Sequence, residues 1–240
     1  MRIPRVYLPE TLQTGARFTL PEVSRQHLLR VLRLKTGNRL QVFDGQGNEY
    51  QAMLLDDKIG IIEILEDIPN PIQESPLTIQ LGQGISRGEK MDFTLQKAVE
   101  LGVNVITPLF TVYSGVTLTA ERLEKRMEHW QGVIQHACEQ CGRAVMPELR
   151  PAMQLSQWLT NLQAELKLVL APTGSHHLKQ LSAAASVALL VGSEGGLHAD
   201  EIQLAIRHQF VDVQLGPRIL RTETAALAAV SALQTLWGDF

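Results

Sequence analysis

The feature that most constrains the fold is a regular alternation of short apolar runs and longer amphipathic segments over residues 77–237. The short runs predict buried strands, and the longer segments, with a period near 3.6 residues, predict helices. The expected strands are 77–81, 103–110, 166–171, 187–191 and 211–215, and the expected helices are 91–101, 119–141, 199–208 and 223–237. This alternation is typical of a parallel sheet with helices on both faces, so we expect an α/β fold.

The N-terminal part of the chain follows a different pattern. Short apolar runs recur there, and the turn sequence Asp-Gly-Gln-Gly-Asn at 44–48 predicts a hairpin. One helix is expected over 21–34, with Pro21 in its first turn and Gly37 after its end. Prolines at 69, 71 and 76 interrupt both patterns. We therefore expect a small β-rich domain at 1–72 and the α/β domain at 73–240.

The composition excludes several classes of protein. A net charge of −3 argues against a protein whose whole surface coats nucleic acid. No apolar run reaches the ~18 residues that a membrane span needs, and the first residues lack the apolar core of a signal peptide. Two cysteines do not form a disulfide framework. We expect a cytoplasmic protein.

Basic residues are concentrated near the N-terminus. Residues 1–40 carry eight Lys or Arg against two acids, whereas residues 41–72 carry one base against seven acids. Arg30 and Arg33 are three apart, so they share one side of the expected helix. A local basic field favours phosphate binding, because neutralised phosphates release their counterions. An ordinary solvated face is the alternative interpretation.

A glycine-rich turn at 82–88 follows the first strand of the α/β domain. It resembles the dinucleotide-binding fingerprint, but its last glycine comes one place late, and the acidic residue expected about twenty positions later is missing. A nicotinamide oxidoreductase is therefore a weak alternative. Arg87 and Lys90 are better interpreted as phosphate contacts, and Arg87 is a candidate RNA-binding residue.

The long helix over 119–141 contains the motif Cys138-Glu139-Gln140-Cys141. Both cysteines lie on the apolar side of this helix, and a zinc site needs four ligands, so we predict core packing and no metal. Glu139 and Arg143 lie off that side, near the edge where an α/β site opens. Both are candidates for the chemistry. Arg143 could hold a phosphate or a base, with a surface ion pair as the alternative.

Two further segments predict the walls of a ligand site. A buried strand runs into Gly192, Gly195 and Gly196, which allow the backbone to approach a flat ligand. The segment lacks the lysine of a phosphate-binding loop, and acids begin the next helix, so a zwitterionic or cationic cofactor fits better than a nucleoside triphosphate. In the second segment a rigid Gly-Pro turn precedes Ile219 and Leu220, whose apolar side chains in a loop suggest a pocket wall.

These segments also carry a resemblance to a known family. Gly192-x-Glu194-Gly195-Gly196, followed by Leu-Gly-Pro-Arg-Ile-Leu-Arg-Thr-Glu-Thr-Ala at 215–225, resembles the signature of the RsmE family, the SPOUT-class methyltransferases of small-subunit ribosomal RNA. The likeness extends to 27–33, 97–103 and 137–143 and covers nearly the whole chain.

The resemblance implies properties that spacing alone does not show. The family transfers a methyl group from S-adenosylmethionine (SAM) to N3 of a specific uridine, U1498, in 16S rRNA of the small ribosomal subunit, and releases S-adenosylhomocysteine. It implies a deep trefoil knot in the C-terminal domain, although knots are almost absent among protein folds. It also implies a PUA-like N-terminal domain and a homodimer.

The resemblance assigns cofactor contacts to seven positions. They are Leu170, Gly192, Gly196, Leu215, Gly216, Ile219 and Leu220.

Two segments depart from the family pattern. Ser193 stands where the family usually has proline, and residues 111–117, where the family has basic or polar residues near the substrate, read Thr-Val-Tyr-Ser-Gly-Val-Thr.

The implied reaction requires a group that acts on the uridine N3 proton, because N3 is protonated at neutral pH. Carboxylates, histidine or a nearby arginine can remove a proton or stabilise the anion, and Glu139 and Arg143 are the predicted catalytic residues. The target base must be exposed, by flipping or in a single-stranded region. A non-catalytic RNA-binding assembly factor with a vestigial pocket is the alternative.

Overall fold

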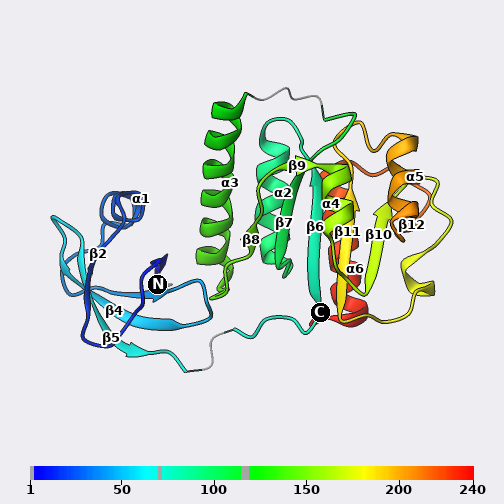
Figure 1. The fold of residues 1–240 in the computed structure, drawn as a ribbon. Helices are drawn as coiled ribbons and strands as arrows, with labels where there is room; N and C mark the ends of the chain where they lie inside the picture. Colours follow the sequence, from blue (N-terminus) through cyan, green and yellow to red (C-terminus); the bar gives the residue numbers. More distant parts are fainter. Residues whose placement is uncertain (1–2, 70–71, 115–118) are drawn as a thin grey trace. The chain divides into compact units, whose positions relative to one another are not determined.

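The computed structural model describes residues 3–69, 72–114 and 119–240. The chain forms two compact units (Figure 1). The first comprises Met1–Glu74 and Gln135–Met146, and the second comprises Ser75–Ile134 and Pro147–Phe240. Helix α3 (Ala120–Cys141) begins in the second unit and ends in the first. Among the described residues, no helix has the length and apolar character of a membrane span.

A five-stranded sheet forms the first unit. Its strands, in the order β1-β3-β4-β5-β2, are β1 (Arg5–Tyr7), β3 (Arg39–Phe43), β4 (Glu49–Asp56), β5 (Ile61–Asp67) and β2 (Arg17–Thr19). The predicted hairpin joins β3 to β4, and the Asp44 carboxylate closes its turn by accepting hydrogen bonds from the backbone N–H groups of Gln46 and Asn48. A β-rich unit was expected and is confirmed.

The N-terminal helix is shorter than the predicted 21–34. Helix α1 covers Glu22–Gln26 and continues as a single π-helical turn, η1, over His27–Val31. Arg33 then adopts a positive φ of 57°, which ends the helical geometry before Gly37 is reached. The apolar period continues beyond the helix because Leu34 also packs into the core.

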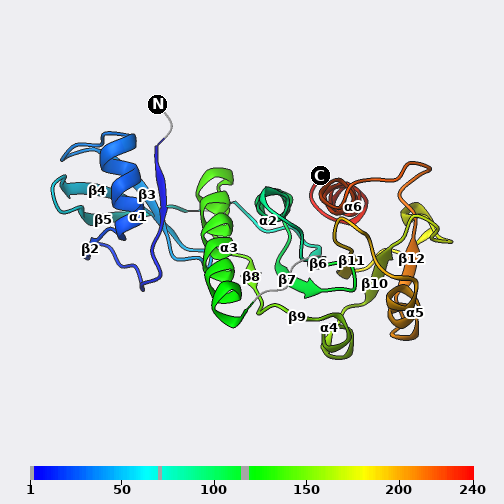
Figure 2. The same cartoon turned by 90° about the horizontal axis from the view of Figure 1, so that it is seen from above.

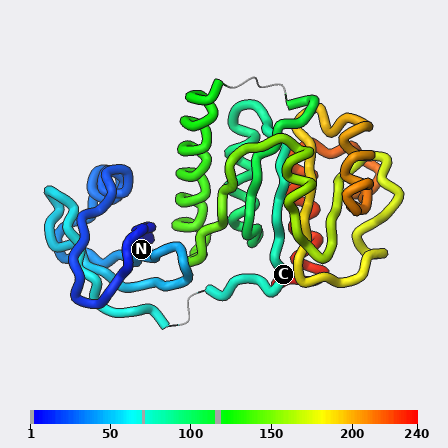
Figure 3. The backbone as a smooth tube through the Cα atoms, in the orientation of Figure 1, coloured from blue at the N-terminus to red at the C-terminus, as the bar shows by residue number. Residues whose placement is uncertain are grey.

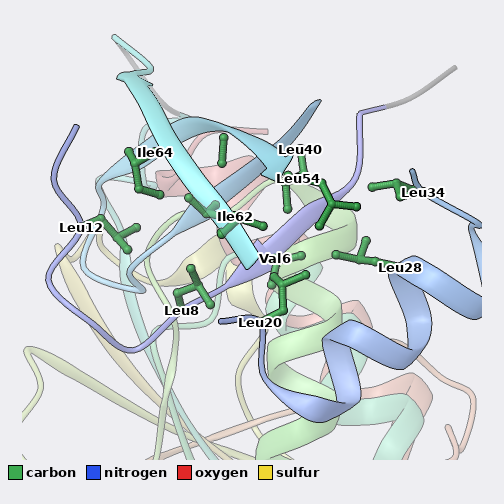
Figure 4. Packing of buried hydrophobic residues seen from close by; sticks show 12 residues of the cluster. Val6, Leu8, Leu12, Leu20, Leu28, Leu34, Leu40, Leu54, Ile62 and Ile64 are labelled. Carbon is green, nitrogen blue, oxygen red and sulfur yellow. The ribbon is translucent and has the colours of Figure 1, made fainter. Parts of the chain in front are cut away.

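The core of the first unit is aliphatic. Figure 4 shows Val6, Leu40, Leu54 and Ile62 on one side of the sheet, with Leu28 of the helical turn packed against them. Alternate residues of a strand point to the same side, so these short strands bury one face each. All five side chains are essentially inaccessible to solvent.

Arg5 explains why the end of α3 belongs to this unit. Its Nε lies 2.6 Å from Oε1 of Glu49, and its Nη1 donates to the backbone oxygen of Cys138, also at 2.6 Å. The guanidinium carbon lies 4.7 Å from the centre of the Phe43 ring. A cation at the carboxyl end of a helix satisfies carbonyls that have no partner in the helix. Arg5 therefore binds the last turn of α3 to the sheet.

The second unit contains the predicted parallel sheet. Every paired neighbour in it is parallel, and the strand order is β12-β10-β11-β6-β7-β8, with β9 also paired to β7. The strands are β6 (Thr78–Gly84), β7 (Val105–Phe110), β8 (Glu148–Leu149), β9 (Met153–Gln154), β10 (Leu166–Leu170), β11 (Ser186–Val191) and β12 (Val211–Val213). The α/β prediction is confirmed.

Helices cover both faces of this sheet. Figure 2 shows α2 (Glu89–Glu100) and α6 (Thr222–Trp237) on one face, and α4 (Leu155–Asn161) and α5 (Ala199–Arg207) on the other. The sequence did not predict α4, a short helix that buries Trp158 against the sheet. A 3-10 turn, η2, covers Leu178–Gln180.

The path of the chain after β11 builds the functional edge of the sheet. Figure 3 shows that the chain leaves β11, passes through α5 and β12, and returns as α6. Helix α6 packs against α2 and β11. The loop after β11 and the loop after β12 therefore meet at the carboxyl ends of the parallel strands. The trefoil knot implied by the family resemblance stays a prediction.

Candidate functional site

A cavity of about 260 Å³ opens at the carboxyl edge of the parallel sheet. Its wall is formed largely by residues 170–172, 191–197, 213–216 and 218–220. These segments follow β10, β11 and β12, and ligands of open α/β sheets bind at this edge. All seven predicted cofactor residues line the cavity: Leu170, Gly192, Gly196, Leu215, Gly216, Ile219 and Leu220. The structure thus brings them together, and their contact with a cofactor stays a prediction.

The glycine loop after β11 folds back on itself. A Cβ atom on Gly192 would lie 2.4 Å from the carbonyl carbon of Gly196, and one on Gly84 of β6 would lie 2.4 Å from the backbone nitrogen of Ser193. Gly196 has a φ of 74° and donates from its N–H to the carbonyl of Ser193. Larger residues would open this loop, so its shape depends on glycine at both contact points.

A buried polar group holds the two loops together. Gln83 is fully buried, and its Nε2 donates to the carbonyl of Gly192 at 3.2 Å and to Oγ1 of Thr222 at 2.9 Å. The Thr222 hydroxyl in turn donates to the same Gly192 carbonyl. One side chain at the end of β6 therefore fixes both the glycine loop and the start of α6. Gln83 was not among the predicted site residues, although a glutamine between two glycines in a buried strand was a usable signal.

The cavity wall also contains a polar atom without a protein partner. Among the described residues, the buried hydroxyl of Ser193 has no hydrogen-bond partner. Ser193 lines the cavity. A buried hydroxyl without a partner is costly, and a ligand in the cavity can satisfy it. Ser193 therefore adds a hydrogen-bonding group where the family usually has proline.

The rim of the cavity carries a carboxylate. Glu194 accepts a hydrogen bond from the backbone N–H of Arg87 at 2.9 Å, and Lys90 Nζ lies 3.7 Å from the same oxygen. Burial on its own would raise the pKa of Glu194, but the hydrogen bond from Arg87 and the charges of Lys90 and Arg87 hold this pKa below its ordinary value. The carboxylate is therefore ionised at neutral pH, and its charge is paired with Lys90 and Arg87 at the edge of the cavity.

The predicted catalytic residues do not line this cavity and have contacts within the first unit. Oε1 of Glu139 accepts hydrogen bonds from the backbone N–H of Tyr7 and from Gln135, each at 3.1 Å. The guanidinium of Arg143 is buried and forms a two-pronged ion pair with Glu74. The alternative suggested for Arg143 was a surface ion pair, whereas the guanidinium in the observed pair is buried. Their catalytic role stays a prediction.

The predicted RNA-binding residues lie in both units. Arg30 and Arg33 are exposed in the first unit, around the end of the helical turn, and Arg87 is exposed in the second unit, at the start of α2. Residues 115–117 of the atypical loop lie outside the described residues, whereas Thr111 to Ser114 are described. RNA binding by the three arginines stays a prediction.

Core packing was predicted for both cysteines, and the structure bears this out for Cys138 but leaves Cys141 only half-buried at the end of α3. Cys138 is buried, and burial raises the pKa of its thiol to about 12, while Cys141 is partly accessible. Within the described ranges, no cluster of three or more His, Cys, Asp or Glu side chains is arranged to hold a metal ion.

Comparison with known proteins identifies the family. The sequence model of an RNA methyltransferase domain matches residues 73–234, and that of an RNA methyltransferase PUA domain matches residues 25–65. Ribosomal RNA small subunit methyltransferase E of Buchnera aphidicola subsp. Schizaphis graminum is 39% identical over 99% of this chain and 98% of its own length.

Solved structures agree over the full length. Ribosomal RNA small subunit methyltransferase E from Neisseria gonorrhoeae, bound to S-adenosyl methionine, is 41% identical with a TM-score of 0.91, and each chain is covered completely. A Legionella pneumophila protein, solved in complex with the bound cofactor SAM, is 40% identical with a TM-score of 0.96, again with complete coverage of both chains. This chain therefore belongs to the ribosomal RNA small subunit methyltransferase E (RsmE) family.

Proposed function

We infer that this chain binds SAM in the cavity at the carboxyl edge of its parallel sheet and methylates N3 of a specific uridine in 16S rRNA. The observation that carries this proposal is the meeting of the seven predicted cofactor residues around one cavity. Two full-length relatives that hold SAM support it. An enzyme of ribosomal RNA acts where ribosomes are assembled, so we propose the cytoplasm as its location.

The residues of the cavity fit such a cofactor. Leu170, Ile219 and Leu220 offer apolar surface for a flat heterocycle, and the closely folded glycine loop offers backbone hydrogen-bonding groups. The Ser193 hydroxyl, which has no hydrogen-bond partner within the described part of the chain, offers one more. When bound, SAM supplies an electrophilic methyl group on a positively charged sulfur. The residues of the cavity position this methyl group and exclude water from its surroundings.

A group that acts on the uridine N3 proton completes the proposal. Glu139 and Arg143 remain our candidates, and their contacts allow a clear test. Glu139→Gln keeps an acceptor for the Tyr7 N–H but removes the negative charge. Arg143→Lys keeps a positive charge and a donor toward Glu74 but loses the planar guanidinium. A role at N3 requires kcat to fall at a temperature at which the variant is still fully folded. A fall in melting temperature with kcat retained would assign both residues to the fold of the first unit.

The test of the whole function uses 30S subunits from cells that lack the gene. The purified chain with isotopically labelled SAM should transfer the label to 16S rRNA, and nucleoside mass spectrometry should find it in 3-methyluridine. A non-catalytic assembly factor would bind 30S subunits without transferring label. Transfer to another nucleoside would keep the methyltransferase and exclude uridine N3.

We also propose that the chain works as a homodimer. Ala232, Thr235 and Leu236 of α6 border an apolar cavity together with Leu215 and Gly216, which also line the cofactor cavity. A second copy seated there would therefore contact the loop that holds the cofactor. Leu236 is 44% exposed on α6, so Leu236→Glu changes the proposed contact surface without disturbing the core of the unit. Light scattering should report a monomer with weakened SAM binding, and a fully active monomer would contradict the dimer.

A further inference from the structure

The loop after β7 places an exposed aromatic ring beside the glycine loop. Tyr113 retains 46% of its accessible surface. Its side chain packs directly on Gly195, because a Cβ atom on Gly195 would lie 2.7 Å from Cβ of Tyr113. Gly195 belongs to the wall of the cavity. Strand β7 runs parallel to β6, so this loop also emerges at the carboxyl edge of the sheet.

One nearly buried carboxylate holds this ring in place. Glu201 accepts hydrogen bonds from the backbone N–H of Val112 through Oε1, at 2.9 Å, and from the backbone N–H of His198 through Oε2, at 2.8 Å. The Tyr113 and His198 rings meet edge to face, with centroids 5.8 Å apart. Glu201 therefore bonds both Val112, the residue before Tyr113, and His198, the ring partner of Tyr113.

The loop itself is closed by a second set of hydrogen bonds. The Ser114 hydroxyl accepts from the backbone N–H of Thr111 at 3.0 Å, and the Ser114 N–H donates to the Thr111 carbonyl. The described part of this loop therefore has a defined shape although it is exposed. A preorganised ring loses little conformational entropy when it binds a ligand.

A rigid, half-exposed aromatic ring at the edge of a ligand cavity is suited to stacking with another flat ring. Base–aromatic stacking is how proteins hold unpaired nucleotides, and a base that is to be modified must leave its stack. We propose that Tyr113 is a positioning residue that stacks with a nucleobase of the RNA substrate at the mouth of the cavity. This inference rests on the proposed function, because it takes the substrate to be RNA.

In this proposal, stacking by Tyr113 takes the place of phosphate contacts that the loop after β7 cannot make. Residues 111–114 contain no lysine or arginine, so this loop has no cation for phosphate contacts. Stacking does not release counterions, so the contribution of Tyr113 should be nearly independent of salt, in contrast to that of the exposed arginines. This difference separates a base contact from a backbone contact.

The test compares Tyr113→Leu, which removes the ring, with Tyr113→Phe, which keeps it. Phe93→Leu is the matched control, since Phe93 is 47% exposed on α2 of the same unit and does not line the cavity. Steady-state kinetics with unmethylated 30S subunits at two salt concentrations give KM and kcat, and calorimetry gives the SAM affinity. We expect Y113L to raise KM about 10-fold to 100-fold, by the same factor at both salt concentrations, with SAM affinity unchanged. Y113F and F93L should stay within about three-fold of the wild type.

Three results would overturn the inference. Equal KM values for an active wild type and Y113L would remove Tyr113 from the substrate site and leave the proposed function intact. Loss of SAM affinity in Y113L would show that the ring only supports the glycine loop. A wild type without methyl transfer would overturn both the inference and the proposed function, and this outcome is seen before any variant is tested.

Discussion

The side-chain amide of Gln83 donates a hydrogen bond to Oγ1 of Thr222 at 2.9 Å, although 139 residues separate them in sequence. Gln83 is the last residue but one of β6, and Thr222 begins α6. Both side chains also bond to the carbonyl of Gly192 in the glycine loop. The two loops of the cavity are therefore fixed through one buried junction, and the geometry of the site depends on it.

Replacing Gln83 tests this junction. Gln83→Leu removes the donor from a fully buried position, which should lower the free energy of unfolding by about 1–3 kcal/mol and weaken SAM binding at least about ten-fold. Gln80→Leu is the control on the same strand, because the Gln80 amide is half-buried and water can replace its bond to the Gln163 carbonyl. Urea unfolding and SAM calorimetry give both quantities. Equal effects of the two substitutions would show that the junction has no special role.

Replacing Arg5 tests how α3 is attached to the first unit. Arg5→Met leaves the buried Glu49 carboxylate unpaired and the Cys138 carbonyl without its donor, so we expect a loss of about 3–5 kcal/mol. Arg17→Met breaks an ion pair whose arginine is 65% exposed, and it should change stability by less than about 1 kcal/mol. The double substitution R5M/E49L should recover most of the loss in a denaturant titration. No recovery would show that the lone charge is not the cause.

The two thiols should differ in reactivity. Burial raises the pKa of Cys138 from its ordinary 9.0 to about 12, so its thiol stays protonated and shielded at pH 8. The folded chain should therefore react with one equivalent of a thiol reagent, at Cys141, and Cys141→Ser should react with none until it is unfolded. The pKa of the Cys138 thiol is higher in the folded chain than in the unfolded chain. The contribution of this thiol to the free energy of unfolding is therefore complete below pH 9 and is lost as the pH rises toward 12. Two fast-reacting thiols at pH 8 would contradict the buried position.

Charge reversal tests the basic end of the first unit. Arg30→Glu together with Arg33→Glu should weaken binding to 30S subunits and lower the slope of log affinity against log salt by about one for each phosphate that is no longer neutralised. Both side chains are exposed, so the melting temperature should hardly change. An unaltered slope in filter-binding titrations would identify this region as an ordinary solvated face.

The sequence predicted the second unit best where a local pattern carried the information. Strand β11 is a continuous apolar run followed by glycine, and β10 is a similar run; both were placed within about a residue of their bounds, whereas one bound of β6, β7 and β12 was missed by two or three residues. Helix α4 and the two-residue strands β8 and β9 were missed, because a segment that short has too few residues to show a period. The helix of the first unit was predicted too long, since Leu34 extends the apolar pattern past the last helical residue.

The parts of the site that rest on distant contacts could not be predicted. Gly192 and Gly196 were identified from local sequence, whereas the bond between Gln83 and Thr222 joins side chains with no shared pattern. The domains were predicted as two continuous stretches divided after residue 72. In the structure, residues 135–146 group with the first unit, where Arg5 binds the Cys138 carbonyl at the end of α3. A backbone carbonyl leaves no mark in a sequence, so an arginine that binds one cannot be paired with it in advance.

A calorimetric titration of SAM into the full-length chain tests the central claim most directly. The wild type should bind SAM saturably, with one site per chain. Gly192→Ala should abolish binding, because a Cβ atom there would lie 2.4 Å from the backbone of Gly196 and open the loop. Gly132→Ala is the control, since nothing lies within 4 Å of a Cβ at that helical position, and it should bind like the wild type. Undiminished SAM affinity in Gly192→Ala would contradict the assignment of this cavity as the cofactor site.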